Sequence, residues 1–141
     1  MSAIVVGTDG SRDAEAAVEK VIELMRGSGI TVHLVCAYPG RSTLERLGLS
    51  ARQEPVDLRG VAADVLGRSE YKLREAGFTV EKQAREGDPA QTILDVADEQ
   101  NADLIVVGAR GTTGLHRFML GSVAAKLSHH APTSLLMVRA D

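Results

Sequence analysis

The sequence predicts an α/β fold, an open parallel five-stranded sheet in a three-layer arrangement with helices on both faces. Two short runs of apolar, β-branched residues, 3–8 and 103–108, are typical of strands buried on both faces. Segments between and after these runs carry apolar residues at helical spacing. Strands that alternate with helices imply parallel pairing through right-handed crossovers. We therefore expect the two most apolar strands to lie side by side at the centre of the sheet.

The first half of the chain contains two strands and one helix, followed by a loop. The strand at 3–8 leads into a helix with Ser11 as its N-cap and the glycine-containing stretch 27–29 as its stop. The apolar stripe of this helix consists of Ala14, Ala17, Val18, Val21, Ile22 and Met25. A second strand is expected at 31–37. Residues 38–55 combine turn residues with mixed polarity, and we interpret them as a mobile loop.

The second half continues the alternation. Its first helix ends at Gly77, although Gly60 and Gly67 lower its intrinsic propensity by about 1 kcal/mol each relative to alanine. The apolar stripe of that helix consists of Leu58, Ala62, Val65, Leu66, Leu73 and Ala76. The remaining expected elements are an edge strand at 78–84, a helix at 87–100 with Asp88 before Pro89, the strand at 103–108, a helix from about Ser122 to His130 and a strand at 133–138.

Length, composition and charge restrict the class of protein. The chain has 141 residues, which fits a single domain over 1–141 that buries about 70% of the surface of its unfolded chain. A net charge of −3 and 3% aromatic residues argue against binding to DNA or RNA. The start of the chain lacks a signal-peptide pattern, and no apolar stretch approaches the roughly 20 residues of a membrane span. With Cys36 as the single cysteine, we expect a cytoplasmic protein that contacts no membrane.

A glycine-rich loop lies between the strand at 103–108 and the next helix. Glycine at 108 and 111 lets backbone N–H groups approach a ligand, and we expect both residues to adopt positive φ so that successive amides form an anion-binding nest. Gly121-Ser122 then begins a helix with unpaired N–H groups, and the Ser122 hydroxyl adds a donor. We interpret the loop as a two-part phosphate cradle at the carboxyl ends of the central strands, where ligands bind in such sheets.

This cradle differs from the common phosphate-binding motifs. The chain has no G-x-x-x-x-G-K-[ST] pattern, and its first turn, GTDGSR, lacks G-x-G-x-x-G, which disfavours a P-loop NTPase or a dinucleotide dehydrogenase. The spacing Gly108-x2-Gly111-x9-Gly121-Ser122 instead resembles the nucleotide loop of ATP-binding members of the universal stress protein family. The resemblance covers the whole chain, through VVGTDGS, EGDPAQTILDVADEQNADLIVVGARG and LGSVAAKLSHHAPTSLLMVR. It implies a Rossmann-type sheet of order 3-2-1-4-5 that binds ATP, usually in a homodimer joined through the last strand.

The resemblance also implies roles for individual residues. Asp9 would face the ribose and the metal–phosphate region, the Ala37 backbone would meet adenine, and the glycine loop would hold the phosphates of ATP bound with Mg²⁺ or Mn²⁺. No metal site made of protein ligands alone is expected. The expected nucleotide-binding residues are Thr8, Asp9, Ala37, Val107, Gly108, Arg110, Gly111, Gly121, Ser122 and Val123. A charge contact from Arg110, His116 or Arg117 to phosphate is our inference from their place between the glycines and not a property of the family.

Some residues also have structural interpretations. Asp9 fits a cap or Asx-turn at the start of the first helix, and both of its roles can hold together. Cys36 is expected to be a small core residue. His129 and His130 point about 100° apart on a helix and cannot share a metal, so we interpret them as contacts with the helix dipole. The loop arginines Arg41, Arg46 and Arg52 are interpreted as solvated, with a lid over the nucleotide as the alternative.

Three functions remain open, and none has an assigned catalytic residue. The first is a nucleotide-dependent regulatory module of the stress response, with at most slow hydrolysis or self-phosphorylation on Thr112, Thr113 or Ser122, because no lysine follows the glycines as in P-loops. The second is an ATP-using transferase, although the S-G-G-x-D-S loop of the pyrophosphatase branch is absent. The third is a dimeric partner-binding module that holds cyclic AMP or another adenylate, or no nucleotide.

The last strand, TSLLMV, suggests an interface. It follows Pro132 and would expose an apolar ladder if it lay unpaired at a sheet edge. Pairing two copies across a twofold axis would satisfy its free N–H and C=O groups and bury Leu136 and Val138 or their alternates. We therefore expect a homodimer through this strand.

Overall fold

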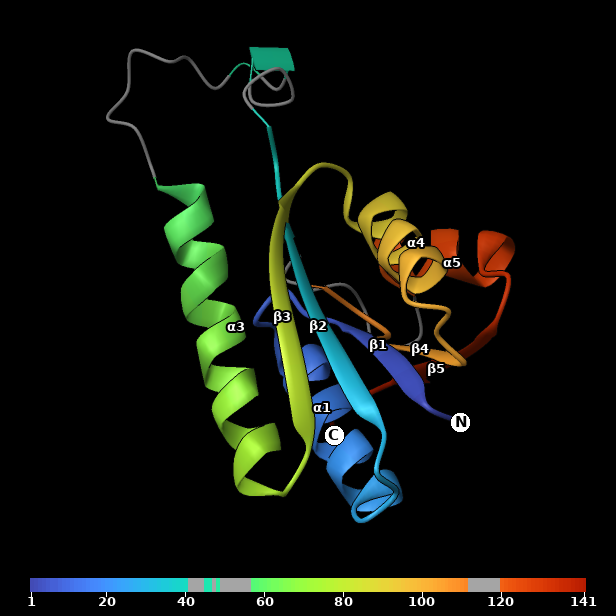
Figure 1. Cartoon of the computed structure of the whole chain (residues 1–141). Helices are drawn as coiled ribbons and strands as arrows, with labels where there is room; N and C mark the ends of the chain where they lie inside the picture. The colour runs from blue at the N-terminus through green and yellow to red at the C-terminus, as the bar shows by residue number, and fades with distance from the viewer. Residues whose placement is uncertain (41–44, 47, 49–56, 112–119) are drawn as a thin grey trace.

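The sheet has five parallel strands in the predicted order. The computed structural model describes residues 1–40, 45, 46, 48, 57–111 and 120–141. The strands are β1 (Ala3–Gly7), β2 (Thr31–Tyr38), β3 (Thr79–Glu86), β4 (Leu104–Gly108) and β5 (Ser134–Val138), arranged β3-β2-β1-β4-β5 (Figure 1). The two most apolar strands are neighbours, since Ile4 of β1 pairs with Leu104 of β4 in parallel register. The fold class and the central pair are therefore confirmed.

Helices cover both faces of this sheet. They are α1 (Arg12–Met25), α3 (Leu58–Glu75), α4 (Pro89–Glu99) and α5 (Ser122–His130). α1 and α3 pack on one face, and α4 and α5 pack on the other (Figure 1). Successive residues of β1 point to opposite faces, so that Ile4 and Val6 join the core under α1 and α3 whereas Val5 joins the core under α4 and α5. All three side chains are fully buried, which explains why this strand is apolar throughout.

Side-chain caps fix where the helices begin. The Ser11 hydroxyl accepts a hydrogen bond from the Ala14 N–H at 3.2 Å, and the Asp88 carboxylate accepts one from the Gln91 N–H at 3.0 Å. Caps of this kind stabilise a helix by about 1 kcal/mol. Both caps are at the predicted residues. α5 differs, because its N-cap is Gly121 and no side chain caps it.

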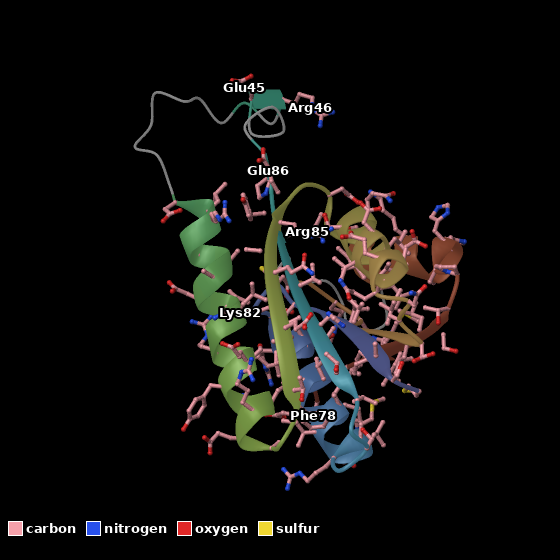
Figure 2. The ribbon with its side chains drawn as sticks, viewed as in Figure 1. Glu45, Arg46, Phe78, Lys82, Arg85 and Glu86 are labelled. Atoms are coloured by element: carbon pink, nitrogen blue, oxygen red, sulfur yellow. The ribbon has the colours of Figure 1, made fainter. Side chains whose placement is uncertain are left out.

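Ion pairs link the edge strand β3 to a helix on each face of the sheet. Lys82 donates to Glu70 of α3 at 2.9 Å, and Arg85 donates to both carboxylate oxygens of Glu99 of α4 at 2.6 and 2.7 Å. The sticks for Lys82 and Arg85 leave β3 towards these helices (Figure 2). β3 runs to Glu86, two residues beyond the predicted end, because it pairs with β2 as far as Tyr38. Charged edges of this kind disfavour pairing with another chain.

The predicted loop 38–55 and its arginines are described only in part. Tyr38 belongs to β2, and most of the predicted loop 38–55 lies outside the described residues. The described residue Arg46 is exposed, and Arg41 and Arg52 lie outside the described part. Among the described helices, none combines the length and hydropathy needed to cross a bilayer.

Candidate functional site

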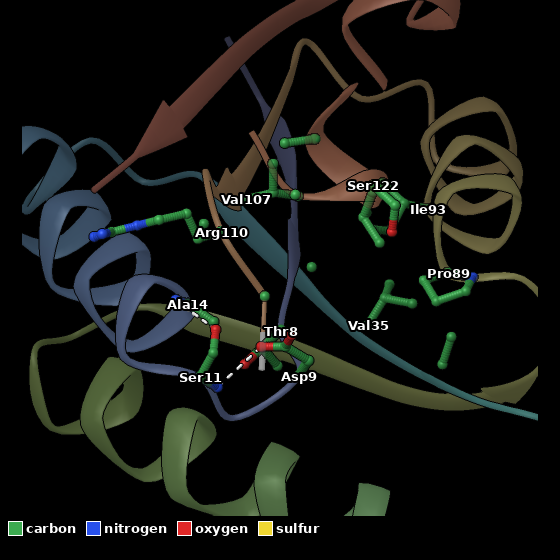
Figure 3. Close-up of a pocket in the computed structure, with 17 residues that line it drawn as sticks. Thr8, Asp9, Ser11, Ala14, Val35, Pro89, Ile93, Val107, Arg110 and Ser122 are labelled. Carbon is green, nitrogen blue, oxygen red and sulfur yellow. Dashed lines mark hydrogen bonds between the residues drawn. The ribbon is translucent and has the colours of Figure 1, made fainter. Parts of the chain in front are cut away.

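A pocket of about 270 Å³ opens at the carboxyl ends of β1 and β4. The strand order reverses between these two neighbours, which is where ligands bind in open α/β sheets. All ten residues expected to bind nucleotide line it, and Gly7, Ser11, Ala14, Val35, Pro89, Ile93 and Ala124 complete the lining. Residues from β1, β2 and β4 and from the starts of α1, α4 and α5 thus meet around one space (Figure 3).

The turn after β1 forms one wall of the pocket. The Thr8 N–H donates to the Val35 carbonyl at 2.9 Å, and the Thr8 hydroxyl accepts from the Gly10 N–H at 3.2 Å. Asp9 is exposed, and its Oδ1 accepts from the Ser11 N–H at 2.9 Å (Figure 3). This contact is the expected Asx-turn. The second carboxylate oxygen, Oδ2, faces Gly111, where an added Cβ would lie 3.2 Å from it.

Two of the three loop glycines, Gly108 and Gly121, are needed for close packing, and none of the three has an unusual dihedral angle. Neither Gly108 nor Gly111 has a positive φ, and φ of Gly121 is −68°, so the expected positive-φ nest is wrong. A Cβ on Gly108 would lie 2.7 Å from the Ala14 nitrogen and 2.7 Å from the Asp13 carbonyl carbon. A Cβ on Gly121 would lie 3.1 Å from the Gly111 nitrogen. At both Gly108 and Gly121, backbone atoms of another segment lie where a Cβ would be, so a side chain does not fit without a shift of the backbone.

The start of α5 supplies the second part of the cradle. The Gly121 N–H donates to the Ala109 carbonyl at 2.7 Å. This bond holds the helix start against residues 108–111 at the end of β4, a segment that we call the arm. The first bond inside the helix runs from the Ala125 N–H to the Gly121 carbonyl. The N–H groups of Ser122 and Val123 therefore have no acceptor in the helix, and the positive end of the helix dipole lies at the pocket. The exposed Ser122 hydroxyl lies beside them.

The opposite wall is apolar. Val35 and Ala37 of β2 line this wall together with Pro89 and Ile93 of α4. β1 pairs with β2 only as far as Gly7 and Val35, so the backbone edge of Ala37 extends past the end of β1. Val35 directs its carbonyl towards β1, and Ala37, two residues later, directs its backbone groups to the same side. The pocket therefore combines an apolar wall and a strand edge that extends past β1 with an amide-rich end.

The Arg110 guanidinium has a different partner from the expected phosphate. Its Nε donates to Asp13 Oδ2 at 2.7 Å, and its Nη2 donates to Asp13 Oδ1 at 2.8 Å and to the Ala140 carbonyl at 3.0 Å. Figure 3 shows this side chain extending towards α1 and away from Pro89 and Val35. The guanidinium holds the pKa of Asp13 below its ordinary value. Arg110 therefore lines the pocket with its charge already paired, which corrects our inference of a phosphate contact.

Asp13 lies beside the pocket and holds the charge of Arg110, a role that sequence reasoning missed. Its side chain is only 5% exposed although it lies in the first turn of a surface helix. Asp13 precedes Ala17 by four residues, which places it on the apolar stripe of α1. A carboxylate at that position on a buried stripe is the signal that could have found it.

Other candidate residues lie away from the pocket chemistry or outside the described residues. Burial, with a smaller contribution from Asp9, raises the pKa of the Cys36 thiol to about 11, and the residue belongs to the core as expected. His129 and His130 lie in the last turn of α5, and no metal-binding group of three or more His, Cys, Asp or Glu residues occurs in the described part of the chain. Thr112, Thr113, His116 and Arg117 lie outside the described residues.

Fold and pocket together define a class of protein, the doubly wound parallel α/β proteins with a ligand pocket where the strand order reverses. The family model of the universal stress protein family matches residues 1–139. Universal stress protein Rv1636 of Mycobacterium tuberculosis is 30% identical over 138 residues, which cover 96% of this chain and 94% of that protein. The chain belongs to the universal stress protein family.

Two solved structures extend the comparison to ligands. A universal stress protein in complex with cAMP is 26% identical, with a TM-score of 0.74 and coverage of 99% of this chain and 98% of that chain. The universal stress protein from Archaeoglobus fulgidus in complex with dAMP is 26% identical, with a TM-score of 0.73 and coverage of 98% of each chain. The family thus includes structural neighbours that bind adenine nucleotides.

Proposed function

We propose that this protein is a cytoplasmic adenine-nucleotide-binding module of the stress response, with ATP as its ligand. The observation that carries the proposal is the polarity of one pocket, with an apolar wall at Val35, Pro89 and Ile93 and an amide-rich end at Gly111 and Ser122. The apolar wall suits a flat base, and the helix N-terminus suits phosphate. The complexes of the two relatives with cAMP and dAMP support the same ligand class.

In this proposal each group of the pocket has a distinct task. The backbone edge of Ala37 meets the base, Asp9 faces the ribose, and the N–H groups of Gly111, Ser122 and Val123 receive the phosphates. Hydrogen bonds to charged groups contribute about 1.5–3 kcal/mol each, so a few of them supply much of the roughly 8 kcal/mol that a micromolar Kd requires. Thr8, Val107 and the two flanking glycines, Gly108 and Gly121, shape the walls.

In this proposal the metal ion binds to the protein together with the nucleotide. Asp9 is the pocket's carboxylate, and a single carboxylate fits Mg²⁺ or Mn²⁺ that keeps its other ligands from phosphate and water. The metal would neutralise phosphate charge. Fast hydrolysis would need a general base and a lysine beside the phosphates, and the described pocket residues do not supply this pair. We therefore propose slow hydrolysis or self-phosphorylation at most.

A panel of adenine nucleotides tests the ligand assignment. Thermal shift and titration calorimetry with ATP, ADP, AMP and cAMP, each with and without Mg²⁺, are expected to show binding, with ATP·Mg²⁺ the tightest. GTP is the control for the base. Tighter binding of cAMP than of ATP would transfer the assignment to the cyclic nucleotide, which the relative in complex with cAMP makes the second candidate. Absence of binding to every member of the panel would refute the proposal.

We also propose that two copies pair through β5. Leu136 is half-buried against the core beneath α1 and α3, and Val138 is already buried within one chain, so the alternates of these two residues are the side chains left for a partner to cover. Met137 is 37% exposed and is the large apolar side chain that β5 offers to a partner. β5 ends the sheet order next to β4, which leaves its other side without a strand in the described chain.

A further inference from the structure

A buried carboxylate connects the glycine loop to two other segments. Asp13 lies in the first turn of α1, and it is not one of the residues that line the pocket. It accepts hydrogen bonds from the Arg110 N–H at 3.0 Å and from the Ala140 N–H at 2.9 Å. It also accepts the two bonds from the Arg110 guanidinium described above. One side chain thus ties together the start of α1, the arm and the residues that follow β5.

The four donors satisfy this carboxylate almost completely. Burial of a charge destabilises the folded protein unless the charge is paired and hydrogen-bonded. Removal of one partner therefore lowers the free energy of unfolding. The Arg110 guanidinium also donates to the Ala140 carbonyl at 3.0 Å, so Arg110 and Ala140 contact each other as well as Asp13. The three residues form one closed network, which we call the Asp13 clasp.

The Asp13 clasp is adjacent to the phosphate-binding end of the pocket. Gly108 permits the close approach of β4 to Asp13 and Ala14, where a Cβ would be 2.7 Å from backbone atoms. Arg110 lies between Gly108 and Gly111, and its N–H donates to Asp13, so that amide is not available to a ligand. The next amide along the chain is that of Gly111, which lines the pocket.

We propose that Asp13 is a positioning residue for nucleotide binding, which holds the Gly108–Gly111 arm in the geometry that accepts phosphate and makes nucleotide affinity depend on Ala140. The inference rests on the proposed function of the pocket. Asp13 acts through Arg110 and touches no ligand. The same clasp links the pocket to the residues that follow β5, the strand we propose as the dimer interface.

Ala140 allows a test that leaves every pocket residue unchanged. Ala140→Pro removes the N–H that Asp13 accepts, because proline has no backbone N–H. Ala140→Ser keeps that N–H and is the matched control. We expect the Kd for ATP·Mg²⁺ to rise about tenfold in Ala140→Pro, the loss of roughly one hydrogen bond to a charged group, and to stay within about twofold in Ala140→Ser.

Two further measurements separate positioning from a general loss of stability. In an Asp13→Ala background, Ala140→Pro should add no further loss of affinity, because no side-chain oxygen remains to accept from the Ala140 N–H. Amide exchange in the ligand-free protein should show the Arg110 and Ala140 amides protected in the wild type and unprotected together in Asp13→Ala. Arg110→Lys, which keeps the charge without the fork of donors, should also weaken binding.

The outcomes separate this inference from the proposed function. An unchanged Kd in a folded Ala140→Pro protein, or independent losses in the double variant, would overturn the positioning role. If the wild type binds no nucleotide, the proposed function fails, and the exchange measurement alone then decides whether Asp13 holds the arm. Rapid exchange of the Arg110 amide in the wild type would overturn the clasp itself.

Discussion

Replacement of Gly108 by alanine tests the packing of the glycine loop. The added Cβ would lie 2.7 Å from the Ala14 nitrogen and the Asp13 carbonyl carbon, against 3.4–4 Å for an ordinary contact. Both are backbone atoms, so the start of α1 or the end of β4 must move. Overpacking of this kind costs about 1–3 kcal/mol of unfolding free energy. With an unfolding entropy of about 2.1 cal/mol/K per residue, the melting temperature should fall by roughly 3–10 °C.

Gly111→Ala is the matched control for this substitution. Its Cβ would lie 3.2 Å from Asp9 Oδ2, the end of an exposed side chain that can rotate away. The gain from restricting the unfolded chain, about 0.4–1 kcal/mol, is shared by both variants and cancels in their difference. Urea unfolding should therefore show Gly108→Ala to be less stable than Gly111→Ala by about 1–3 kcal/mol. Equal stability of the two variants would refute the packing explanation.

Three other perturbations have expected outcomes. Gly111→Val should abolish ATP binding in a folded protein, whereas Gly67→Val on α3, where an added Cβ meets nothing within 4 Å, should leave it intact; calorimetry showing equal affinities would reject the cradle. Met137→Asp should give a monomer in light scattering, and a wild type that is already monomeric at high micromolar concentration would exclude the β5 dimer. The Arg110 guanidinium lowers the pKa of Asp13. The ion pair therefore stabilises the folded protein above the unfolded-state pKa of about 3.9, and this stabilisation is lost as the pH falls through the lower folded-state pKa of Asp13. Urea unfolding across this acidic range should show a smaller pH dependence for Asp13→Asn, and an identical pH dependence would contradict the ion pair.

The strand positions, the central pair of strands and the pocket's location could be predicted from the residues themselves, whereas the strand order 3-2-1-4-5 was expected from the resemblance to the universal stress protein family. The apolar runs of β1 and β4 mark strands buried on both faces, and Ser11 and Asp88 mark helix starts by short-range capping. Carboxyl ends of parallel strands meet at one edge, so residues after β1 and β4 were expected to converge. The strands and caps were inferred from residues within a few positions of one another, and the convergence of the two strand ends follows from the geometry of parallel sheets.

The details that could not be predicted depend on contacts between distant segments. Arg110 and Asp13 are 97 residues apart, and nothing in the local pattern of either shows that the guanidinium has a buried partner. The reason for Gly108 is likewise the backbone of α1, which only the folded chain brings against it. Positive φ was inferred from glycine's conformational freedom, whereas close approach is the other reason for glycine, and here it applies.

Titration calorimetry of the wild-type protein with ATP in the presence of Mg²⁺ tests the central claim most directly. The pocket lies at the carboxyl edge of the sheet, and β5 is one strand beyond it, so all of the described lining residues come from one chain. We expect one nucleotide per chain with a micromolar Kd, about 8 kcal/mol of binding free energy. No heat and no thermal shift with millimolar ATP, or with ADP, AMP and cAMP, would contradict the claim.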